Sequence, residues 1–397
     1  MTLLELAAFV LAFGAIVSRL AFRWIEPWLL GASAIALASA LALNPARWQL
    51  LSAVIGLGLL VLVLRQPVRF GRKSAIAGVV LLGLAAVLAQ TFSMPRLAAP
   101  LGPYAVGTVT DTLVRREGRA ERRLFLKIWY PASNSRAEPE GLWSDLPGMT
   151  DIPWYFRWGL AYLTRAPTHS HPAARYGAGA GPARIVLYNH SFVSWASENS
   201  LLAEDLASRG YTVIAIRHLG QVDEYREGGR ALGEIPTADM RLAGAIMRRR
   251  TDDSRFVADR LGPVLQAVPQ LTGRVPATYA AMGFSLGGAV SSDLCVTDRR
   301  CRAVVNIDGA IPGVDYTRLP TPHYLMVKGS AHAGEDAVRA GGYEEVIYAR
   351  AAHADFLDAA ITLPITRWFF GRSVEELARE RRRQTDLIAS FLARAGR

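Results

Sequence analysis

The stretch Gly283-Phe284-Ser285-Leu286-Gly287-Gly288 decides the fold of this 397-residue chain, because it sets a G-x-S-x-G motif between two recognisable elements. The apolar run 277–282 before it has the length of a short buried strand, and residues 289–295 after it are compatible with a helix. A strand, a glycine turn and a helix in this order predict a nucleophile elbow, which lifts the serine hydroxyl above a sheet. The pattern therefore predicts Ser285 as a nucleophile.

A serine hydroxyl needs a base to activate it, and in folds with this elbow the chain order is Ser, acid, His. Three histidines follow the serine: His323, His332 and His353. We predict His353 as the base, because it follows the strand-like residues 345–348 in a loop at the end of the last strands. His323 opens an apolar run and is typical of a strand start, and His332, in a Gly/Ala loop, is the weaker alternative.

The orienting acid has two candidates. Asp308 ends the strand-like run 303–307, one strand beyond the nucleophile. Asp336 follows the next strand, 324–328, where many enzymes with this elbow carry their acid. Local context favours Asp308, since a strand would fix it, whereas Asp336 lies in a glycine-containing loop. An Asp before a Gly is also common in turns, which is the alternative role for Asp308.

Three segments together carry a family resemblance: Gly283 to Gly288, Asn306-Ile307-Asp308-Gly309-Ala310 and His353-Ala354-Asp355-Phe356. They resemble the platelet-activating-factor acetylhydrolase family and, more widely, the dienelactone-hydrolase-like esterases, over roughly residues 100 to 370. The resemblance implies an α/β-hydrolase fold and a serine carboxylic-ester hydrolase that needs no metal and no cofactor. It also implies substrates among phospholipids with short or oxidised acyl chains, or other lipid esters.

Two backbone N–H groups must face the carbonyl oxygen as it becomes negative. One is expected from Leu286, directly after the nucleophile. The segment Leu187-Tyr188-Asn189-His190-Ser191-Phe192 resembles the family's oxyanion loop, with His190-Ser191 where the family has His-Gly. The second N–H is therefore expected from Phe192. His190 equally suits the role of tying down its own loop.

These residues predict two-step acyl transfer, in which the histidine takes the serine proton and the aspartate stabilises the imidazolium. An acyltransferase or a peptidase could use the same set, because a triad does not choose the acyl acceptor. A membrane protein whose hydrolase-like domain only binds a ligand is the alternative from another class.

The first hundred residues have a different character. A helix needs about 20 mainly apolar residues to cross a bilayer, and a signal peptide has only one short apolar region. We therefore predict a transmembrane region over residues 1–96 with four helices, three being the main alternative, followed by a hydrolase domain over residues 97–397. The uncharged apolar runs are 3–17, 28–43, 50–64 and 75–92.

Basic residues in the short loops predict the orientation. The loops after the first and third runs hold six basic residues, whereas the intervening loop holds only Arg47. Both termini are then outside, which predicts a multi-pass protein of the plasma or inner membrane with an extracytoplasmic hydrolase domain. The six residues are Arg19, Arg23, Arg65, Arg69, Arg72 and Lys73.

The chain has a net charge of +11 and two cysteines. Membrane lipids with anionic headgroups are the favoured partner for this charge, rather than nucleic acid, and a solvated arginine-rich surface is the alternative. Cys295 and Cys301 are six residues apart and suit a disulfide in an oxidising compartment, or else two buried thiols. Their spacing, without nearby histidines, does not predict a metal site. Oligomeric state is not predicted.

The pattern of strands and helices after residue 97 predicts an α/β fold. Residues 106–114 and 124–130 alternate like antiparallel strands, and shorter apolar runs farther along alternate with helical stretches, which is typical of parallel winding. We expect cap insertions near residues 141–172, which are rich in aromatics, and 220–270, whose basic stretch 241–250 is expected to face water or phosphate. An amphipathic helix over 374–392 is expected to close the domain.

Overall fold

The structure is a computed structural model with two compact units. The helical unit contains residues 1–97, 144–166 and 362–371, and the sheet unit contains residues 98–143, 167–361 and 372–397. The residues described are 2–21, 26–44, 47–65, 67–117, 120–149, 152–192, 194–218, 240–271, 275–309, 323–329, 344–363 and 371–396.

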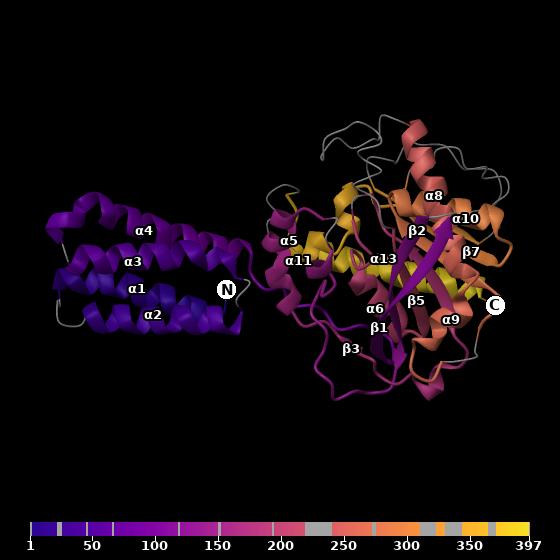
Figure 1. The fold of residues 1–397 in the computed structure, drawn as a ribbon, viewed down its shortest axis with the longest axis horizontal. Coiled ribbons are helices and arrows are strands. Elements are labelled where there is room, and N and C mark those ends of the chain that lie inside the picture. Colours follow the sequence, from indigo (N-terminus) through magenta and orange to yellow (C-terminus); the bar gives the residue numbers. More distant parts are fainter. Residues whose placement is uncertain are drawn as a thin grey trace. The chain divides into compact units, whose positions relative to one another are not determined.

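A mixed, mostly parallel sheet forms the centre of the sheet unit (Figure 1). Over the described residues its strands are β1 (Ala105–Glu117), β2 (Ala120–Ala132), β3 (Ser170–Pro172), β4 (Arg184–Asn189), β5 (Tyr211–Arg217), β6 (Tyr279–Phe284), β7 (Cys301–Ile307), β8 (Tyr324–Lys328) and β9 (Glu344–Ile347). Their order across the sheet is β3-β1-β2-β5-β4-β6-β7-β8-β9. β2 is antiparallel to both β1 and β5, and from β5 to β9 all neighbours are parallel. The carboxyl ends of the parallel strands therefore share one edge.

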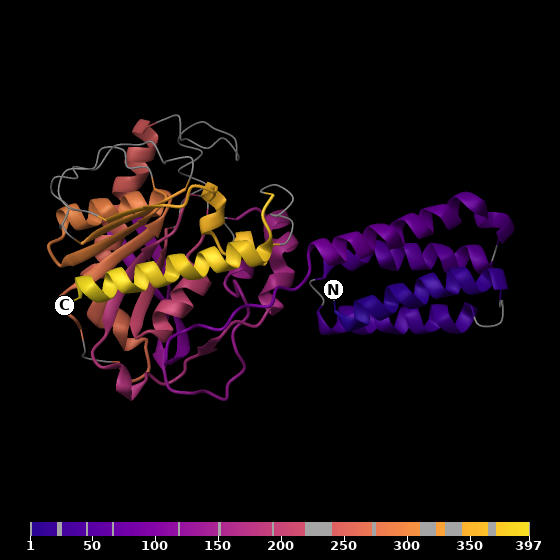
Figure 2. The same ribbon diagram turned by 180° about the vertical axis from the view of Figure 1, so that it is seen from behind.

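Helices cover both faces of this sheet (Figures 1 and 2). On one face lie α6 (Ser200–Ser208) and α13 (Val374–Ala395), and on the other lie α8 (Met240–Ala258), α9 (Leu261–Gln266) and α10 (Leu286–Thr297). Successive residues of β4 alternate between the two cores: Leu187 packs with α8 to α10, whereas Val186 and Tyr188 pack with α6 and α13. Burial on both faces explains why the parallel strands read as continuous apolar runs.

The closing helix forms as predicted. Ser373 caps α13, because its Oγ accepts a hydrogen bond of 3.1 Å from the backbone N–H of Glu376. The apolar residues that the sequence placed on its inner face are buried: Leu377, Ile388, Phe391 and Leu392.

Within the described residues, the helical unit consists mainly of α1 (Leu3–Ala21), α2 (Glu26–Leu43), α3 (Leu51–Arg65) and α4 (Pro67–Thr91). They lie where the four apolar runs predict helices. Two short helices from the later segment, α5 (Trp154–Leu160) and the 3₁₀ helix η3 (Ala161–Arg165), belong to the same unit. The indole Nε1 of Trp48 donates to the backbone oxygen of Gly159 at 2.8 Å, which ties this segment to the start of α3.

Small residues allow these helices to pack closely. A Cβ added to Gly56 of α3 would lie 2.8 Å from the backbone oxygen of Gly78 in α4, and one added to Gly78 would lie 2.9 Å from the oxygen of Gly56. The two backbones therefore touch at this point. Alanines supply much of the remaining interior: Ala8, Ala12, Ala15, Ala36, Ala40, Ala53, Ala85 and Ala89.

Some leucines share this interior, but many large apolar side chains point outward from the bundle. Those that are at least half exposed on the four helices are Leu3, Val10, Phe13, Trp28, Ile35, Leu43, Leu51, Ile55, Ile76, Val80 and Val87.

No helix among the described residues combines the length and the apolar character that a membrane crossing demands. The helix α3, for example, has 15 residues and rises about 22 Å, against about 30 Å for a hydrocarbon core. The four crossings predicted from the apolar runs are therefore not found in these helices.

The two expected insertions differ from the sequence-based division of the chain. Most of the aromatic segment, residues 144–166, belongs to the helical unit by its contacts. Of the second segment, residues 219–239 lie outside the described residues, and the following residues form α8. Met247 of α8 packs against Ala289 and Val290 of the elbow helix.

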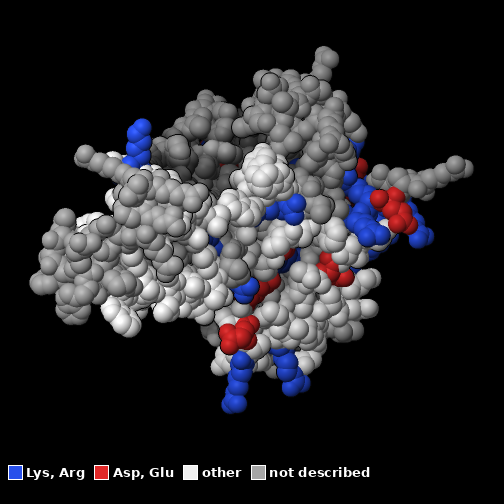
Figure 3. Space-filling model, turned by 60° about the vertical axis from the view of Figure 1, so that its left-hand side comes forward, with Lys and Arg blue, Asp and Glu red and all other residues white. Residues whose placement is uncertain are grey.

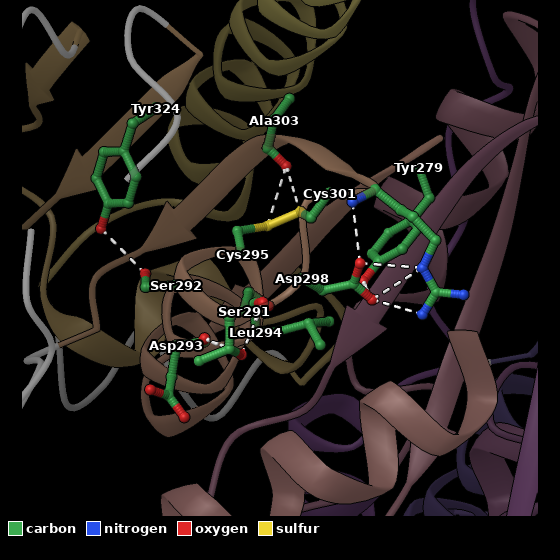
Figure 4. The surroundings of a disulfide bond; sticks show 12 residues. Tyr279, Ser291, Ser292, Asp293, Leu294, Cys295, Asp298, Cys301, Ala303 and Tyr324 are labelled. Atoms are coloured by element: carbon green, nitrogen blue, oxygen red, sulfur yellow. Dashed lines mark hydrogen bonds and ion pairs between the residues drawn. A yellow bond between two sulfur atoms is a disulfide. The ribbon is translucent and has the colours of Figure 1, made fainter. Parts of the chain in front are cut away.

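Cys295 and Cys301 form a disulfide with a Cα–Cα distance of 5.0 Å, which joins the end of α10 to the start of β7 (Figure 4). Beside it the carboxylate of Asp298 accepts hydrogen bonds from the hydroxyl of Tyr279 at 2.8 Å and from the backbone N–H of Arg300 at 2.9 Å. The connection between the serine and aspartate segments is thus fixed both covalently and by polar contacts. The sequence left the bridge and two free thiols as alternatives, and the structure has the bridge.

Charged side chains are spread over the surface. On the face drawn in Figure 3, the described Lys and Arg side chains are interspersed with Asp and Glu and do not gather in one field.

Candidate active site

Ser285 lies at a sharp turn between β6 and α10. Its backbone has φ 54° and ψ −126°, a conformation that is strained for a residue with a side chain, and its N–H donates to the oxygen of Ile307 at 2.8 Å. A Cβ at Gly283 would lie 2.2 Å from the oxygen of Gly287, and one at Gly287 would lie 2.0 Å from the oxygen of Asn189. The turn therefore requires glycine at both positions.

The three predicted side chains come together at the carboxyl edge of the sheet. His353 Nε2 lies 2.9 Å from the Oγ of Ser285, and His353 Nδ1 lies 2.6 Å from Oδ2 of Asp308. A carboxylate can only accept, so Nδ1 carries the ring proton of the neutral histidine and Nε2 accepts from the serine hydroxyl. This is the arrangement in which a histidine can remove the proton of a serine nucleophile.

Asp308 is held by the strands on either side of it. It directly follows β7, its backbone has φ 50°, and its N–H donates to the oxygen of Val327 in β8 at 2.7 Å. Oδ1 of the carboxylate accepts from the N–H of Gly329 at 2.7 Å, and the residue is 1% exposed. One oxygen is therefore fixed by the backbone, while the other faces His353.

His353 begins the 3₁₀ helix η8 (His353–Phe356), and its ring centroid lies 4.6 Å from that of Phe284. Asp355 stabilises this turn: its Oδ2 accepts from the N–H of Ala352 and from Nη1 of Arg372, both at 2.9 Å. The His-x-Asp-Phe segment thus supplies its own support for the histidine.

Of the competing candidates, the structure describes only His323, and it does not contact the triad. His323 precedes β8, and its backbone oxygen accepts from the N–H of Val304, as expected for a strand start. His332 and Asp336 lie outside the described residues.

The predicted oxyanion donors lie on either side of the elbow. Leu286 is the first residue of α10, and Phe192 lies in the loop after β4. The 2.0 Å approach at Gly287 shows that the end of β4 lies against the first turn of α10. Both residues are therefore at the same edge of the sheet as the serine.

His190 is buried in this loop and ties it down, as the sequence allowed. Its Nδ1 lies 2.7 Å from the oxygen of Ser191, and its Nε2 lies 3.2 Å from the backbone N of His218. Nδ1 therefore donates and Nε2 accepts. Burial, together with the nearby Arg250 guanidinium, holds the pKa of His190 well below its ordinary value, so that the ring stays neutral.

Sequence reasoning missed a second buried histidine–carboxylate pair beneath the loop. His218 Nδ1 lies 3.1 Å from Asp253, and Nε2 lies 3.1 Å from the side-chain oxygen of Asn189. Arg122 contacts the same carboxylate at 2.7 Å. Burial lowers the pKa of His218 to about 4 despite the carboxylate. No local motif marks this pair, because its two members lie 35 residues apart in the sequence.

Two further charged residues at this loop were also missed. Glu198 accepts from the N–H of Ser191 at 2.8 Å, and Nη1 of Arg250 lies 3.3 Å from the oxygens of both His190 and Ser191. The expectation that the basic stretch 241–250 faces water or phosphate is wrong for Arg250, which is fully buried. A buried arginine within a helix such as α8 cannot be told from an exposed one in an arginine-rich sequence.

Comparison with known proteins bears on the fold. No family model matches the chain, and no curated protein matches it in sequence. Among solved structures, a ferulic acid esterase from Streptomyces cinnamoneus is similar, with a TM-score of 0.55, 24% identity, and coverage of 77% of this chain and 94% of that one. In the part of this chain that is described, no three His, Cys, Asp or Glu side chains gather in a way that could hold a metal ion. The strand order, the elbow and this likeness together show that the chain has the α/β-hydrolase fold.

Proposed function

We propose that the protein is a serine carboxylic-ester hydrolase with Ser285, His353 and Asp308 as its triad. The observation that carries the proposal is the pair of contacts at His353, 2.9 Å to the serine Oγ and 2.6 Å to the aspartate. The structural neighbour is named as an esterase, which favours ester chemistry on this fold.

In the proposed mechanism, Ser285 attacks the ester carbonyl while Nε2 of His353 takes its proton. Asp308 stabilises the resulting imidazolium through Nδ1, and it stays in place because Gly329 holds its other oxygen. His353 then protonates the leaving alcohol. Water activated by the same Nε2 releases the acyl group from the serine.

The N–H groups of Leu286 and Phe192 would bind the carbonyl oxygen as it becomes negative. Leu286 opens a 12-residue helix, whose N-terminal dipole also favours negative charge. The site thus supplies a nucleophile, a base and an electrostatic binding site for the oxyanion without a cofactor.

The substrate class that we propose is a lipid ester, with short-chain or oxidised phospholipids first. This part of the proposal rests on the resemblance of the three site segments to platelet-activating-factor acetylhydrolases and on the apolar outer face of the helical unit. Acyl transfer to an alcohol, or peptide hydrolysis, are the alternatives that the same triad permits. A ligand-binding protein without turnover remains the non-enzymatic alternative.

The decisive experiment measures hydrolysis of p-nitrophenyl acetate, butyrate, octanoate and palmitate by the detergent-extracted protein and by Ser285→Ala. We expect turnover that the variant loses, together with fluorophosphonate labelling that only the wild type shows. Ser292→Ala is the matched control, since Ser292 lies on the same helix and bonds to the oxygen of Gly288. Equal activity of Ser285→Ala and wild type would refute the proposal, and labelling without turnover on any ester would favour the ligand-binding alternative.

We propose, second, that the helical unit holds the protein in a membrane with the sheet unit on the extracytoplasmic side. Large apolar side chains on the outside, and close backbone contact through Gly56 and Gly78, are the pattern of helices packed in lipid. The loop charges favour the orientation. The disulfide suits an oxidising compartment.

This second proposal is tested by fractionation. The protein should stay in the pellet during a carbonate wash and enter solution with detergent. A membrane-impermeant protease should cleave within residues 98–397 in intact spheroplasts. Release of the protein by carbonate or salt would refute integral anchoring, and protection of the sheet unit would reverse the orientation.

A further inference from the structure

Ser191, whose carbonyl group forms the peptide with Phe192, is held by buried charged side chains on both sides. The N–H of Ser191 donates to Oε1 of Glu198 at 2.8 Å, and the oxygen of Ser191 lies 3.3 Å from Nη1 of Arg250. Glu198 is 2% exposed and Arg250 is fully buried. Two charges removed from water beside one loop are costly, so their contacts with that loop call for a functional explanation.

The contacts of Glu198 converge on this one loop and the strand before it. Oε1 also accepts from the hydroxyl of Tyr188 at 2.7 Å, and Oε2 accepts from the Oγ of Ser191 at 2.6 Å. Three donors around one group suit an ionised carboxylate, which can only accept. The backbone and the side chain of Ser191 are both fixed by this one residue.

On the other side of Ser191, its carbonyl oxygen is approached by donors. The oxygen of Ser191 receives Nδ1–H of His190 at 2.7 Å as well as the Arg250 guanidinium. This oxygen and the N–H of Phe192 belong to one peptide group. Hydrogen bonds and positive charge at the oxygen polarise that group, and a polarised peptide is a stronger donor at its N–H.

We propose that Glu198 and Arg250 are positioning residues for the oxyanion hole: they orient the Ser191–Phe192 peptide, and Arg250 also polarises it, so that the N–H of Phe192 binds the oxyanion. The proposal rests on the serine hydrolase function proposed above. Neither side chain touches the substrate; each acts through the loop. The consequence is confined to the transition state, since the ground-state carbonyl carries little charge for the hole to bind.

The substitutions Glu198→Gln and Arg250→Met test this role in the full-length, detergent-extracted protein. Removing a direct oxyanion donor lowers the rate by about 10²–10³-fold in a protease, so a misoriented or less polarised donor should lower kcat by about 10- to 100-fold. KM should change by less than about threefold, because ground-state binding is untouched. Arg250→Lys, which keeps the charge, should retain more activity than Arg250→Met.

A transition-state analogue separates this role from a merely structural one. A trifluoromethyl ketone with the preferred acyl chain adds to Ser285 and places an anionic oxygen in the hole. Its inhibition constant should rise in each variant by about the same factor as kcat/KM falls. The matched control is Glu204→Gln, since Glu204 is a second buried glutamate, lies in α6 and accepts from the N–H of His169 away from the site. It should lower the melting temperature with kcat/KM unchanged within about twofold.

The outcomes distinguish the two proposals. Folded Glu198→Gln and Arg250→Met proteins with unchanged kcat and unchanged affinity for the ketone would overturn the positioning role, as would equal losses in Glu204→Gln. If Ser285→Ala kept full activity, the result would refute the serine hydrolase function and not only the positioning role. Should no ester turn over, the rate of fluorophosphonate labelling replaces kcat. As Ser285 attacks phosphorus and fluoride leaves, the phosphoryl oxygen becomes more negative in the transition state, and the same hole binds it. A labelling rate unaffected by both substitutions would likewise overturn the role.

Discussion

The two compact units bury their apolar residues in opposite ways. In the sheet unit, large side chains fill the interior on both faces of the sheet, for example Leu187 on one face and Phe284 on the other. In the helical unit, alanines such as Ala85 lie inside while Val80 and Val87 of the same helix point outward. A core of large residues is what water requires, and a small-residue interior with an apolar exterior is what lipid permits. The difference supports the proposal that the helical unit lies in a membrane and the sheet unit in water.

The two units also differ in how much they depend on exact side-chain geometry. The sheet unit holds a strained serine, an aspartate at φ 50° and a histidine within 3 Å of both. The helical unit holds none of the seven histidines of the chain, which all lie between residues 169 and 353. Substitutions should therefore act through geometry in one unit and through packing in the other.

The largest effect is expected at the triad. His353→Gln or Asp308→Asn should lower kcat by about 10³-fold or more, because the base or its tautomer is lost. The controls are His323→Gln and Asp336→Asn, the candidates that the sequence ranked lower, and these should stay within about threefold of wild type. Ester hydrolysis at pH 8 measures all four. If Asp336→Asn lost most activity while Asp308→Asn kept it, the acid would be Asp336. If His323→Gln lost most activity while His353→Gln kept it, the base would be His323.

A matched pair of glycine substitutions compares the two units next. Gly287→Ala places a Cβ 2.0 Å from the oxygen of Asn189 and should cost on the order of 3 kcal/mol of stability, with most activity lost. A Cβ at Gly58 of α3 meets nothing within 4 Å, so Gly58→Ala should be neutral or stabilising by up to about 1 kcal/mol. Thermal unfolding in detergent measures both. If Gly287→Ala were as stable as Gly58→Ala, the elbow would be less tightly packed than its contacts indicate.

Much of the site follows from the sequence because its signals are local. The strand, the turn and the helix around Ser285 are contiguous, and both Asp308 and His353 lie next to strands of the parallel sheet. Parallel strands bring their carboxyl ends to one edge, so residues 23 and 68 positions beyond the serine could be placed beside it. A serine nucleophile needs a base and an acid, and this requirement indicated which residue types to look for.

The supports of the site did not follow from the sequence, because they depend on contacts between distant segments. Arg250 and His190 are 60 residues apart, and a buried arginine looks the same in a sequence as a solvated one. Residues 144–166 were expected on the sheet unit, yet Trp48 and Gly159 join them to the helical unit. Periodicity predicts which face of an element is apolar, not which of two units it packs against.

The packing of the helical unit is tested by one substitution at two places on α4. Ala85→Leu puts three more carbons into a closed interior and should destabilise the unit by about 1–3 kcal/mol. Ala77→Leu adds the same atoms to an exposed position of the same helix and should be neutral in detergent. The midpoint of unfolding in a denaturing detergent compares them. A greater loss from Ala77→Leu would reverse the assignment of inside and outside.

The smallest expected effect is a pH dependence confined to the sheet unit. The pKa of His218 is about 4 in the folded protein and about 6.5 when unfolded, so its contribution to stability is complete above pH 6.5 and is lost as the pH falls toward 4. Near pH 5.5 the loss should be on the order of 1 kcal/mol. Burial raises the pKa of Glu198 and Glu204, which acts in the opposite sense, so the His218→Gln variant is needed to isolate the histidine.

Hydrogen exchange followed by mass spectrometry can resolve this pH effect by unit. Between pH 7.5 and 5.5, exchange through unfolding should increase for peptides of β4 and β5 once intrinsic rates are corrected, and less for α3 and α4, whose unit contains no histidine. The His218→Gln variant should be less stable at pH 7.5, because Asp253 loses a partner, but its stability should change less with pH. His171→Gln, which alters a histidine whose Nδ1 lies 2.8 Å from the backbone oxygen of Ala137 at the surface, is the control. If exchange increased equally in both units, protonation of His218 would not be the cause of the pH dependence. The pH effect would then not distinguish the sheet unit from the helical unit.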